Sequence, residues 1–282
     1  MGAFLSRQRE VDELRKDVFK KFDGQKILLI GTLGSGKSSL VNSINYVLNL
    51  ENPNAHYHEV AELSDSEAYH GTPVYRMYTP EKDLYHEVKD QNLLEDVSSA
   101  PTLFDISGVD EQLLDGDQLD LKKFLLCVFQ GKVEEFTDII KIFNTPEELE
   151  KVAIQEAADD RRPWSVVCVV SLAAVFPTKF YENVAKALRE TKANQGGINV
   201  FVVLTKGDTL NLAEKKQKVQ SYSERCKTTL NMSEGRIFEV TNYTSKQWGK
   251  GNQRMDKDTE KERKILFFLN RIFLSCYKPR WT

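Results

Sequence analysis

Short continuous apolar runs alternate with segments of helical periodicity along the chain. The runs at 166–172 and 200–204 have the length and composition of strands that are buried on both faces of a parallel sheet. Residues 74–78 alternate between apolar and polar positions, as a strand with one buried face does. The predicted strands are 26–30, 74–78, 102–104, 166–172, 200–204 and 236–241.

Apolar residues spaced three or four positions apart predict helices between these strands. In the first helix Val11, Leu14 and Val18 share one face, and Gly24 follows where the helix ends. The predicted helices are 7–22, 37–48, 181–192 and 259–277, together with a charge-rich helical segment at 113–163. Because strands alternate with helices, we predict a doubly wound α/β fold with a mostly parallel sheet and helices on both faces.

A glycine-rich motif lies between the first predicted strand and the helix that follows it. Residues 31–38 read GTLGSGKS and match the P-loop pattern G-x-x-x-x-G-K-[ST]. The glycines let backbone N–H groups surround phosphates, and the helix N-terminus adds its positive dipole end. Lys37 is predicted to bridge the β- and γ-phosphates as a catalytic residue, and Ser38 to offer its hydroxyl to Mg²⁺. The predicted phosphate contacts are Gly31, Leu33, Gly34, Ser35, Gly36, Lys37, Ser38 and Ser39.

The tetrapeptide after the strand at 200–204 indicates which base is bound. Thr205, Lys206 and Asp208 belong to the sequence TKGD, which matches [NT]-K-x-D. A carboxylate at Asp208 can accept from both the N1–H and the N2 amine of guanine, a pair of donors that adenine lacks. Two such charge-assisted hydrogen bonds, at about 1.5–3 kcal/mol each, would favour guanine by roughly two to four decades. Lys206 is predicted to lie along the base and the P-loop.

A third motif of the form D-x-x-G lies between the other two. Asp105 directly follows the predicted strand 102–104, and Gly108 completes the motif. Asp105 is predicted to hold Mg²⁺ through water, and Gly108 to donate its N–H to the γ-phosphate during catalysis. The motif is short, so its weight comes from its position between the P-loop and the TKGD tetrapeptide.

Two loops remain to be assigned around such a site. A hydroxyl between the first helix and the second strand should close over the γ-phosphate and ligate Mg²⁺. Thr72 is the best placed for this catalytic and metal-binding role, with Ser64 and Ser66 as alternatives. On the base side, Thr241 and Asn242 follow the last strand, and the backbone there or the Asn242 amide is predicted to reach the guanine O6.

Two departures from common GTPase patterns predict slow hydrolysis. Val109 follows Gly108, where many GTPases carry a glutamine that orients the attacking water. Leu33 occupies a P-loop position that is often glycine. Another residue or a second protomer would have to position the water. The nearby histidines are either candidates for this role or ordinary surface residues, and they are His56, His58 and His70.

The length and composition suit one domain of this kind. The chain has 282 residues, of which 40% are apolar, enough for a substantial core. We predict a P-loop NTPase G domain at 26–282 with a helical insertion at about 113–164, and an N-terminal helix within 1–25 that packs on it. The formal net charge of −3 provides no overall field for nucleic acid, so no nucleic-acid partner is expected.

Cysteine usage and the N-terminus bear on the compartment. The four cysteines lack paired or metal-ligand spacing, which indicates a reducing environment, and no apolar leader segment begins the chain. We therefore expect a cytoplasmic protein. The first residues, MGAFLS, match the N-myristoylation pattern M-G-x-x-x-[ST]. Membrane contact is expected only if Gly2 carries this lipid, and an unmodified terminus is the alternative.

With these motifs in place, the chain resembles the interferon-induced protein 44 family of GTPase-like proteins. The segments that carry the resemblance are KILLIGTLGSGKSSLVNSI, TPVYRMY, TLFDISGVD, VVCVV, INVFVVLTKGD and RIFEVTNYTSK. Immunity-related and dynamin-like GTPases share the P-loop and the TK-x-D pattern less completely. The resemblance implies a cytoplasmic protein that binds GTP or GDP with Mg²⁺ and is linked to innate immune or antiviral responses.

Three functions are compatible with these motifs. The first is a GTPase switch or self-assembling GTPase, in which the helical segment 113–163 reports the nucleotide state to a partner or to a second copy. The second is a guanine-nucleotide-binding module with negligible hydrolysis, which acts through interaction. The third is a P-loop ATPase or kinase, which would bind ATP more tightly than GTP.

Overall fold

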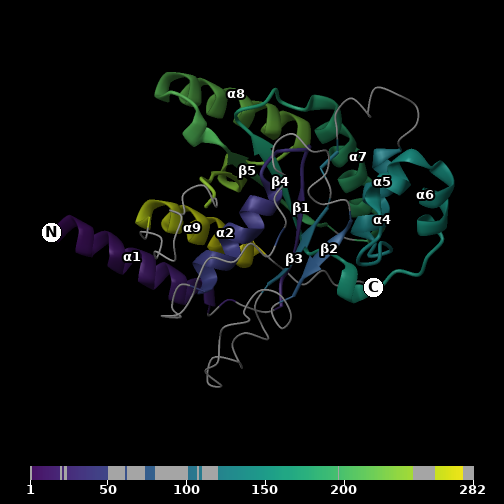
Figure 1. The fold of residues 1–282 in the computed structure, drawn as a ribbon, viewed down its shortest axis with the longest axis horizontal. Coiled ribbons are helices and arrows are strands. Elements are labelled where there is room, and N and C mark those ends of the chain that lie inside the picture. Colours follow the sequence, from purple (N-terminus) through teal and green to yellow (C-terminus); the bar gives the residue numbers. More distant parts are fainter. Residues whose placement is uncertain are drawn as a thin grey trace, which may run out of the picture.

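The computed structural model arranges the chain around one central sheet (Figure 1). The described residues are 2–19, 21, 24–49, 61, 74–79, 101–106, 108–109, 120–195, 197–243 and 258–275. The sheet has six strands in the order β2-β3-β1-β4-β5-β6. They are β1 (Lys26–Ile30), β2 (Arg76–Tyr78), β3 (Thr102–Asp105), β4 (Ser165–Ser171), β5 (Asn199–Thr205) and β6 (Ile237–Glu239). β2 pairs antiparallel with β3, and the other neighbouring pairs are parallel.

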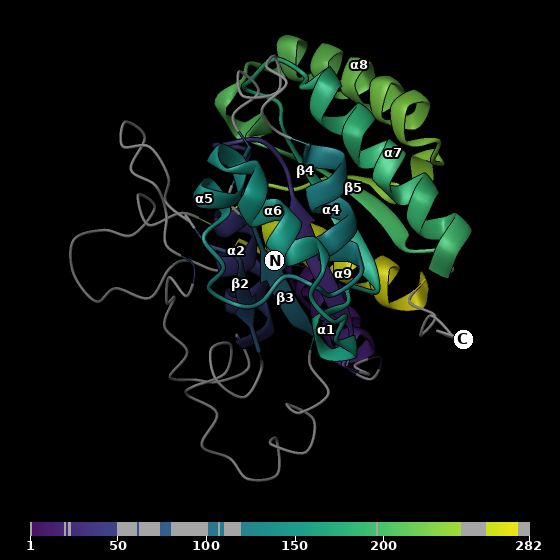
Figure 2. The ribbon, with the colours of Figure 1, turned by 90° about the vertical axis from the view of Figure 1, so that its right-hand side faces the viewer.

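Helices cover both faces of this sheet. One face carries α1 (Gly2–Phe19), α2 (Lys37–Asn49) and α9 (Thr259–Ser275). The other carries α4 (Leu121–Phe129), α5 (Ile139–Asn144), α6 (Pro146–Ala153), α7 (Thr178–Gln195) and α8 (Leu212–Leu230). Figure 2 shows α7 and α8 lying side by side above the strands. No helix in the described part of the chain is long and apolar enough to cross a membrane.

The alternation of side chains along each strand creates the two cores. In β1, Leu28 and Ile30 join the core beneath α4 and α7, while Ile27 and Leu29 join the core beneath α2 and α9. This is the pattern of a strand buried on both faces, since successive side chains point to opposite sides of a sheet. The α/β fold predicted from the apolar runs is therefore confirmed.

Several predicted boundaries differ from those observed. The first helix is Gly2–Phe19 rather than 7–22, and the last strand is Ile237–Glu239 rather than 236–241. The described part of the helical insertion is not one long helix but α4, α5, α6 and the 3-10 turn Asp159–Arg161. Thr145 ends α5 and Pro146 begins α6, because proline suits the first turn of a helix and cannot continue the preceding one.

One helix was not predicted from the sequence at all. α8 has 19 residues, yet it buries only Tyr222 and Cys226 among mostly charged and polar positions. Its ends carry clear signals, since the Asn211 side chain accepts from the Glu214 N–H and Asn231 adopts a left-handed conformation at the C-cap. A helix with so few apolar residues gives almost no periodic signal in the sequence, but its capping residues can still indicate where it begins and ends.

The N-terminal helix is held by a buried ion pair. α1 packs along α9, and the Arg15 guanidinium lies 3.1 Å from the Glu262 carboxylate with both side chains buried. Removing one partner of such a pair leaves an uncompensated buried charge, which is strongly destabilising. The pair therefore links α1 directly to α9.

Candidate nucleotide-binding site

The P-loop joins the carboxyl end of β1 to the first turn of α2. Gly34 and Gly36 have φ values of 68° and 95°, which L side chains rarely adopt. A Cβ on Gly36 would also approach the Asn242 amide nitrogen to 3.2 Å. The loop closes on itself through a hydrogen bond from the Ser35 N–H to the Thr32 carbonyl. These features produce the curled backbone that surrounds phosphates in P-loop proteins.

Lys37 lies folded over this loop. Its ammonium donates to the Gly31 and Thr32 carbonyls at 3.3 and 3.2 Å, and the residue is 6% exposed. Burial lowers the pKa of Lys37 from its ordinary value, while the nearby Asp105 carboxylate opposes this effect. An ammonium whose charged form is disfavoured by burial gains when an anion arrives beside it. The position therefore suits a phosphate ligand.

Asp105 and Ser38 meet beside the P-loop. The Ser38 hydroxyl donates to Asp105 Oδ2 at 2.9 Å, and Asp105 is 0% exposed. Burial raises the pKa of Asp105, with Lys37, the Ser38 hydroxyl and Arg76 opposing the shift. Asp105 Oδ1 is buried and accepts no hydrogen bond from the described residues. A hydroxyl next to a carboxylate with an unused oxygen is a donor set that suits Mg²⁺, and the residues thus fit this ion.

The D-x-x-G glycine lies directly against the P-loop. A Cβ on Gly108 would come within 2.4 Å of the Leu33 Cα, so only glycine fits this approach. The Leu33 N–H donates to the Val109 carbonyl at 3.2 Å. The segment after β3 therefore continues alongside the segment after β1, as a short extension of the parallel pairing of these strands.

The TKGD tetrapeptide begins at the end of β5 and is tied to the P-loop by its first residue. The buried Thr205 hydroxyl donates to the Ser35 carbonyl at 2.6 Å and contacts the Val170 carbonyl at 3.3 Å. Lys206 has a φ of 58°, which turns the chain sharply into the 3-10 turn Gly207–Thr209. The side chains of Lys206 and Asp208 are exposed. The base-reading residues are thus presented to solvent beside the phosphate loop.

The segment after β6 contacts the P-loop through Asn242. The Asn242 amide donates one of its two N–H groups to the Gly36 carbonyl at 3.1 Å, so this side chain supports the loop. Its Oδ1 is buried without a hydrogen bond from the described residues. Thr241 precedes it and is half-buried.

Sequence reasoning missed two residues of α2 that hold this segment, Ser43 and Tyr46. The Tyr243 N–H donates to the Ser43 hydroxyl at 2.8 Å, and the Tyr243 ring packs edge-on against Tyr46. These contacts join the end of β6 to α2. No spacing in the sequence signals them, because 200 residues separate the hydrogen-bonded pair.

The remaining predicted site residues divide into two groups. Gly31, Leu33, Gly34 and Ser39 belong to the described P-loop and the start of α2. Thr72, its alternatives Ser64 and Ser66, and the histidines His56, His58 and His70 lie outside the described residues. The structure accordingly brings together Lys37, Ser38, Asp105 and Gly108, with Thr205 linking them to the TKGD turn.

Known structures share this architecture at low sequence identity. No protein-family model and no curated protein matches the sequence. A dimerization-deficient mutant of Toc33 from Arabidopsis thaliana is similar in structure, with a TM-score of 0.50 and 14% identity over 98% of this chain and 94% of that chain. Toc33 in complex with GDP and Mg²⁺ gives 0.47 and 15% identity, covering 98% and 94% of the two chains. Toc33 with Mg²⁺ and GMPPNP gives 0.48 and 13%, again over 98% and 94%.

At these identities the likeness is one of fold. The six-stranded, mostly parallel sheet with helices on both faces corresponds to the architecture of the Toc33 structure. The chain therefore has an α/β fold similar to that of Toc33.

Proposed function

We propose that this chain binds GTP and GDP together with Mg²⁺. The observation that carries the proposal is the meeting of three distant sequence motifs at the carboxyl end of the sheet. Lys37 and Ser38 come from the P-loop and Asp105 from the D-x-x-G motif, and the Thr205 hydroxyl bonds the TKGD turn to the P-loop. In open α/β sheets, ligands bind at this edge of the strands.

Each polar group at the phosphate end has a role in this proposal. The P-loop amides and the Lys37 ammonium would hold the phosphates, while the Ser38 hydroxyl and the Asp105 carboxylate would hold Mg²⁺, Asp105 through water. Thr72 is proposed to complete the metal site from the loop before β2. When bound, Mg²⁺ neutralises charge on the phosphate oxygens. The Lys37 ammonium would gain further anionic neighbours, in addition to Asp105, when phosphates arrive.

Asp208 is proposed to select guanine. Its carboxylate is exposed at the 3-10 turn after β5, where a base can approach it. Lys206 would lie along the plane of the base. Thr241 and Asn242 are proposed for the O6 side, where either the backbone or the second N–H of the Asn242 amide would donate to O6, since the other N–H is bonded to Gly36.

Slow hydrolysis is part of the proposal. Val109 occupies the position of the water-orienting residue, and its side chain is buried in the core rather than directed at a water. The same observation favours the second candidate, a guanine-nucleotide-binding module with negligible turnover. Phosphate release by the purified protein distinguishes the two, with Lys37→Ala as the control for contaminating activity.

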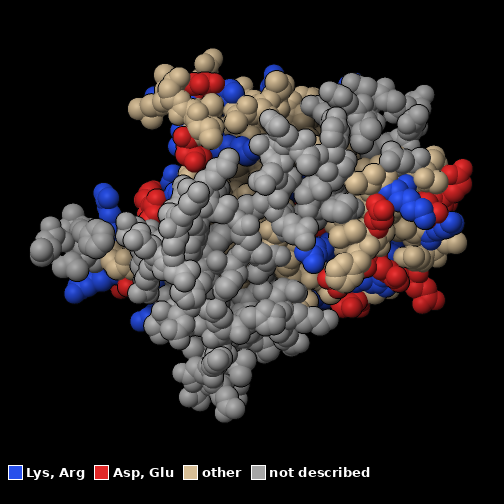
Figure 3. Space-filling view, in the orientation of Figure 1, with Lys and Arg blue, Asp and Glu red and all other residues tan. Residues whose placement is uncertain are grey.

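The helical insertion is proposed to respond to the nucleotide. The Phe136 N–H donates to the Tyr75 carbonyl at 2.8 Å, and the Tyr75 N–H donates to the Thr137 carbonyl at 3.0 Å. This pairing fastens the loop between α4 and α5 to the chain just after Thr72, the proposed Mg²⁺ ligand. Figure 3 shows acidic and basic side chains interspersed over the insertion, and Lys151 and Glu148 form an ion pair at 2.7 Å there. A mixed surface of this kind is ordinary for solvated helices, so the pairing with Tyr75 carries this part of the proposal.

Two further elements of the proposal rest on likeness. The resemblance to the interferon-induced protein 44 family motivates a cytoplasmic role in innate immune or antiviral responses. The similar Toc33 structure is of a dimerization-deficient mutant, which motivates a test of self-association here. Sedimentation of this chain with GDP and with a GTP analogue would reveal a nucleotide-dependent dimer, and a monomer under both conditions would contradict it.

Competition for a fluorescent guanine nucleotide tests the central proposal. Unlabelled GTP and GDP should displace the probe in the presence of Mg²⁺, and ATP should compete far more weakly. Lys37→Ala should abolish probe binding while leaving the circular dichroism spectrum unchanged. Equal competition by ATP would support the ATPase or kinase alternative, and a folded protein that binds none of these nucleotides would contradict the proposal outright.

A further inference from the structure

The P-loop and the segment after β3 are in direct backbone contact beside the proposed phosphate site. The Leu33 N–H donates to the Val109 carbonyl at 3.2 Å, and Thr32 and Val109 form a parallel bridge. On the same side, a Cβ on Gly108 would stand 2.4 Å from the Leu33 Cα and 2.6 Å from the Leu33 nitrogen. The two backbones are therefore in direct contact. We call this arrangement of Thr32, Leu33, Gly108 and Val109 the closing contact.

The closing contact joins two backbone segments that, in the proposed site, would both face a γ-phosphate. In the proposed site, the γ-phosphate accepts from the Gly108 N–H on one side and faces the P-loop on the other. Each N–H···O bond needs about 2.9 Å between heavy atoms, so a phosphate between two backbones holds them well apart. Direct contact between Gly108 and Leu33 leaves no such space. The rest of the P-loop, from Gly34 to Ser38, lies outside the contact and can serve the first two phosphates.

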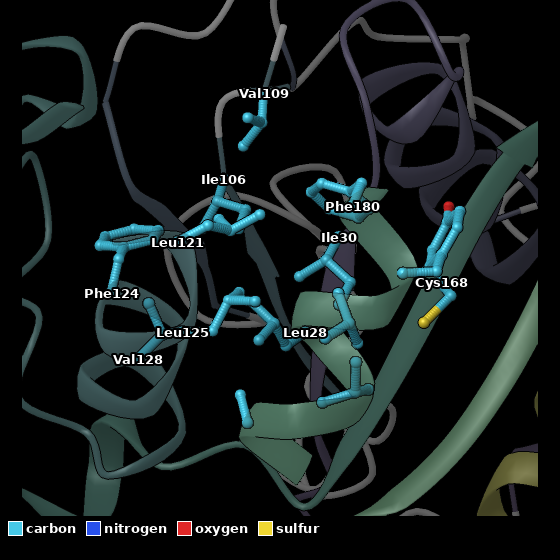
Figure 4. Close-up of a cluster of buried hydrophobic side chains, with 14 of the residues drawn as sticks. Leu28, Ile30, Ile106, Val109, Leu121, Phe124, Leu125, Val128, Cys168 and Phe180 are labelled. Atoms are coloured by element: carbon cyan, nitrogen blue, oxygen red, sulfur yellow. The ribbon is translucent and has the colours of Figure 1, made fainter. Parts of the chain in front are cut away.

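A buried side chain holds the closing contact in place. Val109 is 1% exposed and belongs to the apolar core beneath α4 and α7, whereas Leu33 is 39% exposed. Figure 4 shows Val109 at one end of the core cluster that includes Ile106, Leu121 and Phe180. Separating Gly108 from Leu33 would require the adjoining Val109 to move, and burial of its apolar side chain opposes that movement.

We infer that the closing contact makes this protein select guanosine diphosphate over triphosphate, with Val109 as the residue that sets the selectivity. The inference rests on the proposed function and adds to it the preferred ligand. Diphosphate enters the closed form directly. Triphosphate binds only the fraction of molecules in which Val109 has left its site, so its apparent affinity falls by that fraction.

Binding of GDP and of a non-hydrolysable GTP analogue, each with Mg²⁺, tests this selectivity in the full chain. The wild-type protein should bind GDP at least tenfold more tightly than the analogue. Val109→Ala removes two buried methyl groups and so makes it easier for residue 109 to leave the core. The preference for GDP over the analogue should therefore fall by roughly fivefold to tenfold. The matched control is Val184→Ala, because Val184 is 0% exposed in the same core but lies in α7, outside both the closing contact and the helical insertion. The control should leave the ratio unchanged.

Hydrogen exchange at the Leu33 amide tests the contact without any nucleotide. In the nucleotide-free wild-type protein this amide should exchange slowly, because it is bonded to the Val109 carbonyl. It should exchange faster in Val109→Ala and at the wild-type rate in Val184→Ala. Equal GDP and analogue affinities in the wild type, or a ratio that Val109→Ala does not move, would overturn the inference while leaving the proposed function standing. Failure to bind either nucleotide would overturn both.

Discussion

The phosphate end and the base end of the proposed site differ in how the protein treats their charges. At the phosphate end Lys37 and Asp105 are buried. Burial lowers the pKa of Lys37 and raises the pKa of Asp105, so it favours the neutral form of each side chain. At the base end Lys206 and Asp208 stand on an exposed turn. The first pair carries a desolvation cost that a ligand can offset, whereas the second pair stays in contact with solvent.

This difference indicates at which end of the site a substitution would also change the stability of the fold. Asp105 ends a central strand and Lys37 begins the helix that packs on that sheet, so changes there act on both binding and stability. Asp208 lies in a surface turn, so changes there should act on binding alone.

Loss of the Lys37 ammonium should have the largest effect. Lys37→Ala removes charge-assisted hydrogen bonds to two phosphates, at about 1.5–3 kcal/mol each, and should weaken GTP and GDP binding by roughly two to four decades. Titration calorimetry measures the loss. Lys216→Ala, at an exposed position of α8, is the control and should bind normally. Near-normal nucleotide affinity in Lys37→Ala would show that the phosphate end has been misplaced.

Exchange of the carboxylate at Asp208 should alter base choice without altering stability. Asp208→Asn should weaken GTP binding about a hundredfold and improve binding of xanthosine triphosphate, because xanthine presents an acceptor where guanine presents a donor. Its free energy of unfolding in urea should stay within about 0.5 kcal/mol of wild type, as expected for an exposed side chain. A variant that keeps its GTP affinity would contradict the assignment of guanine recognition to this turn.

Thr205 should couple the two ends, since its hydroxyl bonds to the P-loop carbonyl of Ser35. Thr205→Val keeps the shape but leaves buried carbonyls without their donor, which should cost about 1–2 kcal/mol of stability and roughly tenfold in GDP affinity. Thr205→Ser retains the hydroxyl and is the matched control. Urea unfolding and GDP titration should change together in the valine variant. If the valine variant lost stability but kept its GDP affinity, Thr205 would not couple the base-reading turn to the phosphate-binding loop.

The pH dependence of stability should reveal the buried carboxylate. Because the folded-state pKa of Asp105 lies above its ordinary value of 3.8, the folded protein binds more protons there than the unfolded chain does. This stabilising contribution is fully present below pH 3.8 and is lost as the pH rises through the raised pKa. Unfolding free energy of the nucleotide-free protein should accordingly fall over that range. Asp105→Asn should flatten the fall, and Asp208→Asn should leave it intact.

Much of the fold could be predicted because its strands are buried on both faces. Such strands appear as continuous apolar runs, and β1 was predicted at its observed bounds, Lys26–Ile30. α8 escaped prediction because a helix that buries two residues in 19 has almost no apolar stripe. The insertion was predicted as helical but not as several short helices, since charge-rich periodicity does not reveal where each one ends.

The sequence by itself determined the chemistry of the candidate site. A lysine and a serine after a glycine loop, an aspartate after a strand, and a TKGD turn are local patterns whose residue types limit what they can bind. Only the tertiary structure decided that Thr205 bonds to Ser35, that Asn242 supports Gly36, and that Val109 closes on Leu33. These contacts join residues from about 75 to more than 200 positions apart, and they arise because strand order and register bring the loop ends to one edge of the sheet.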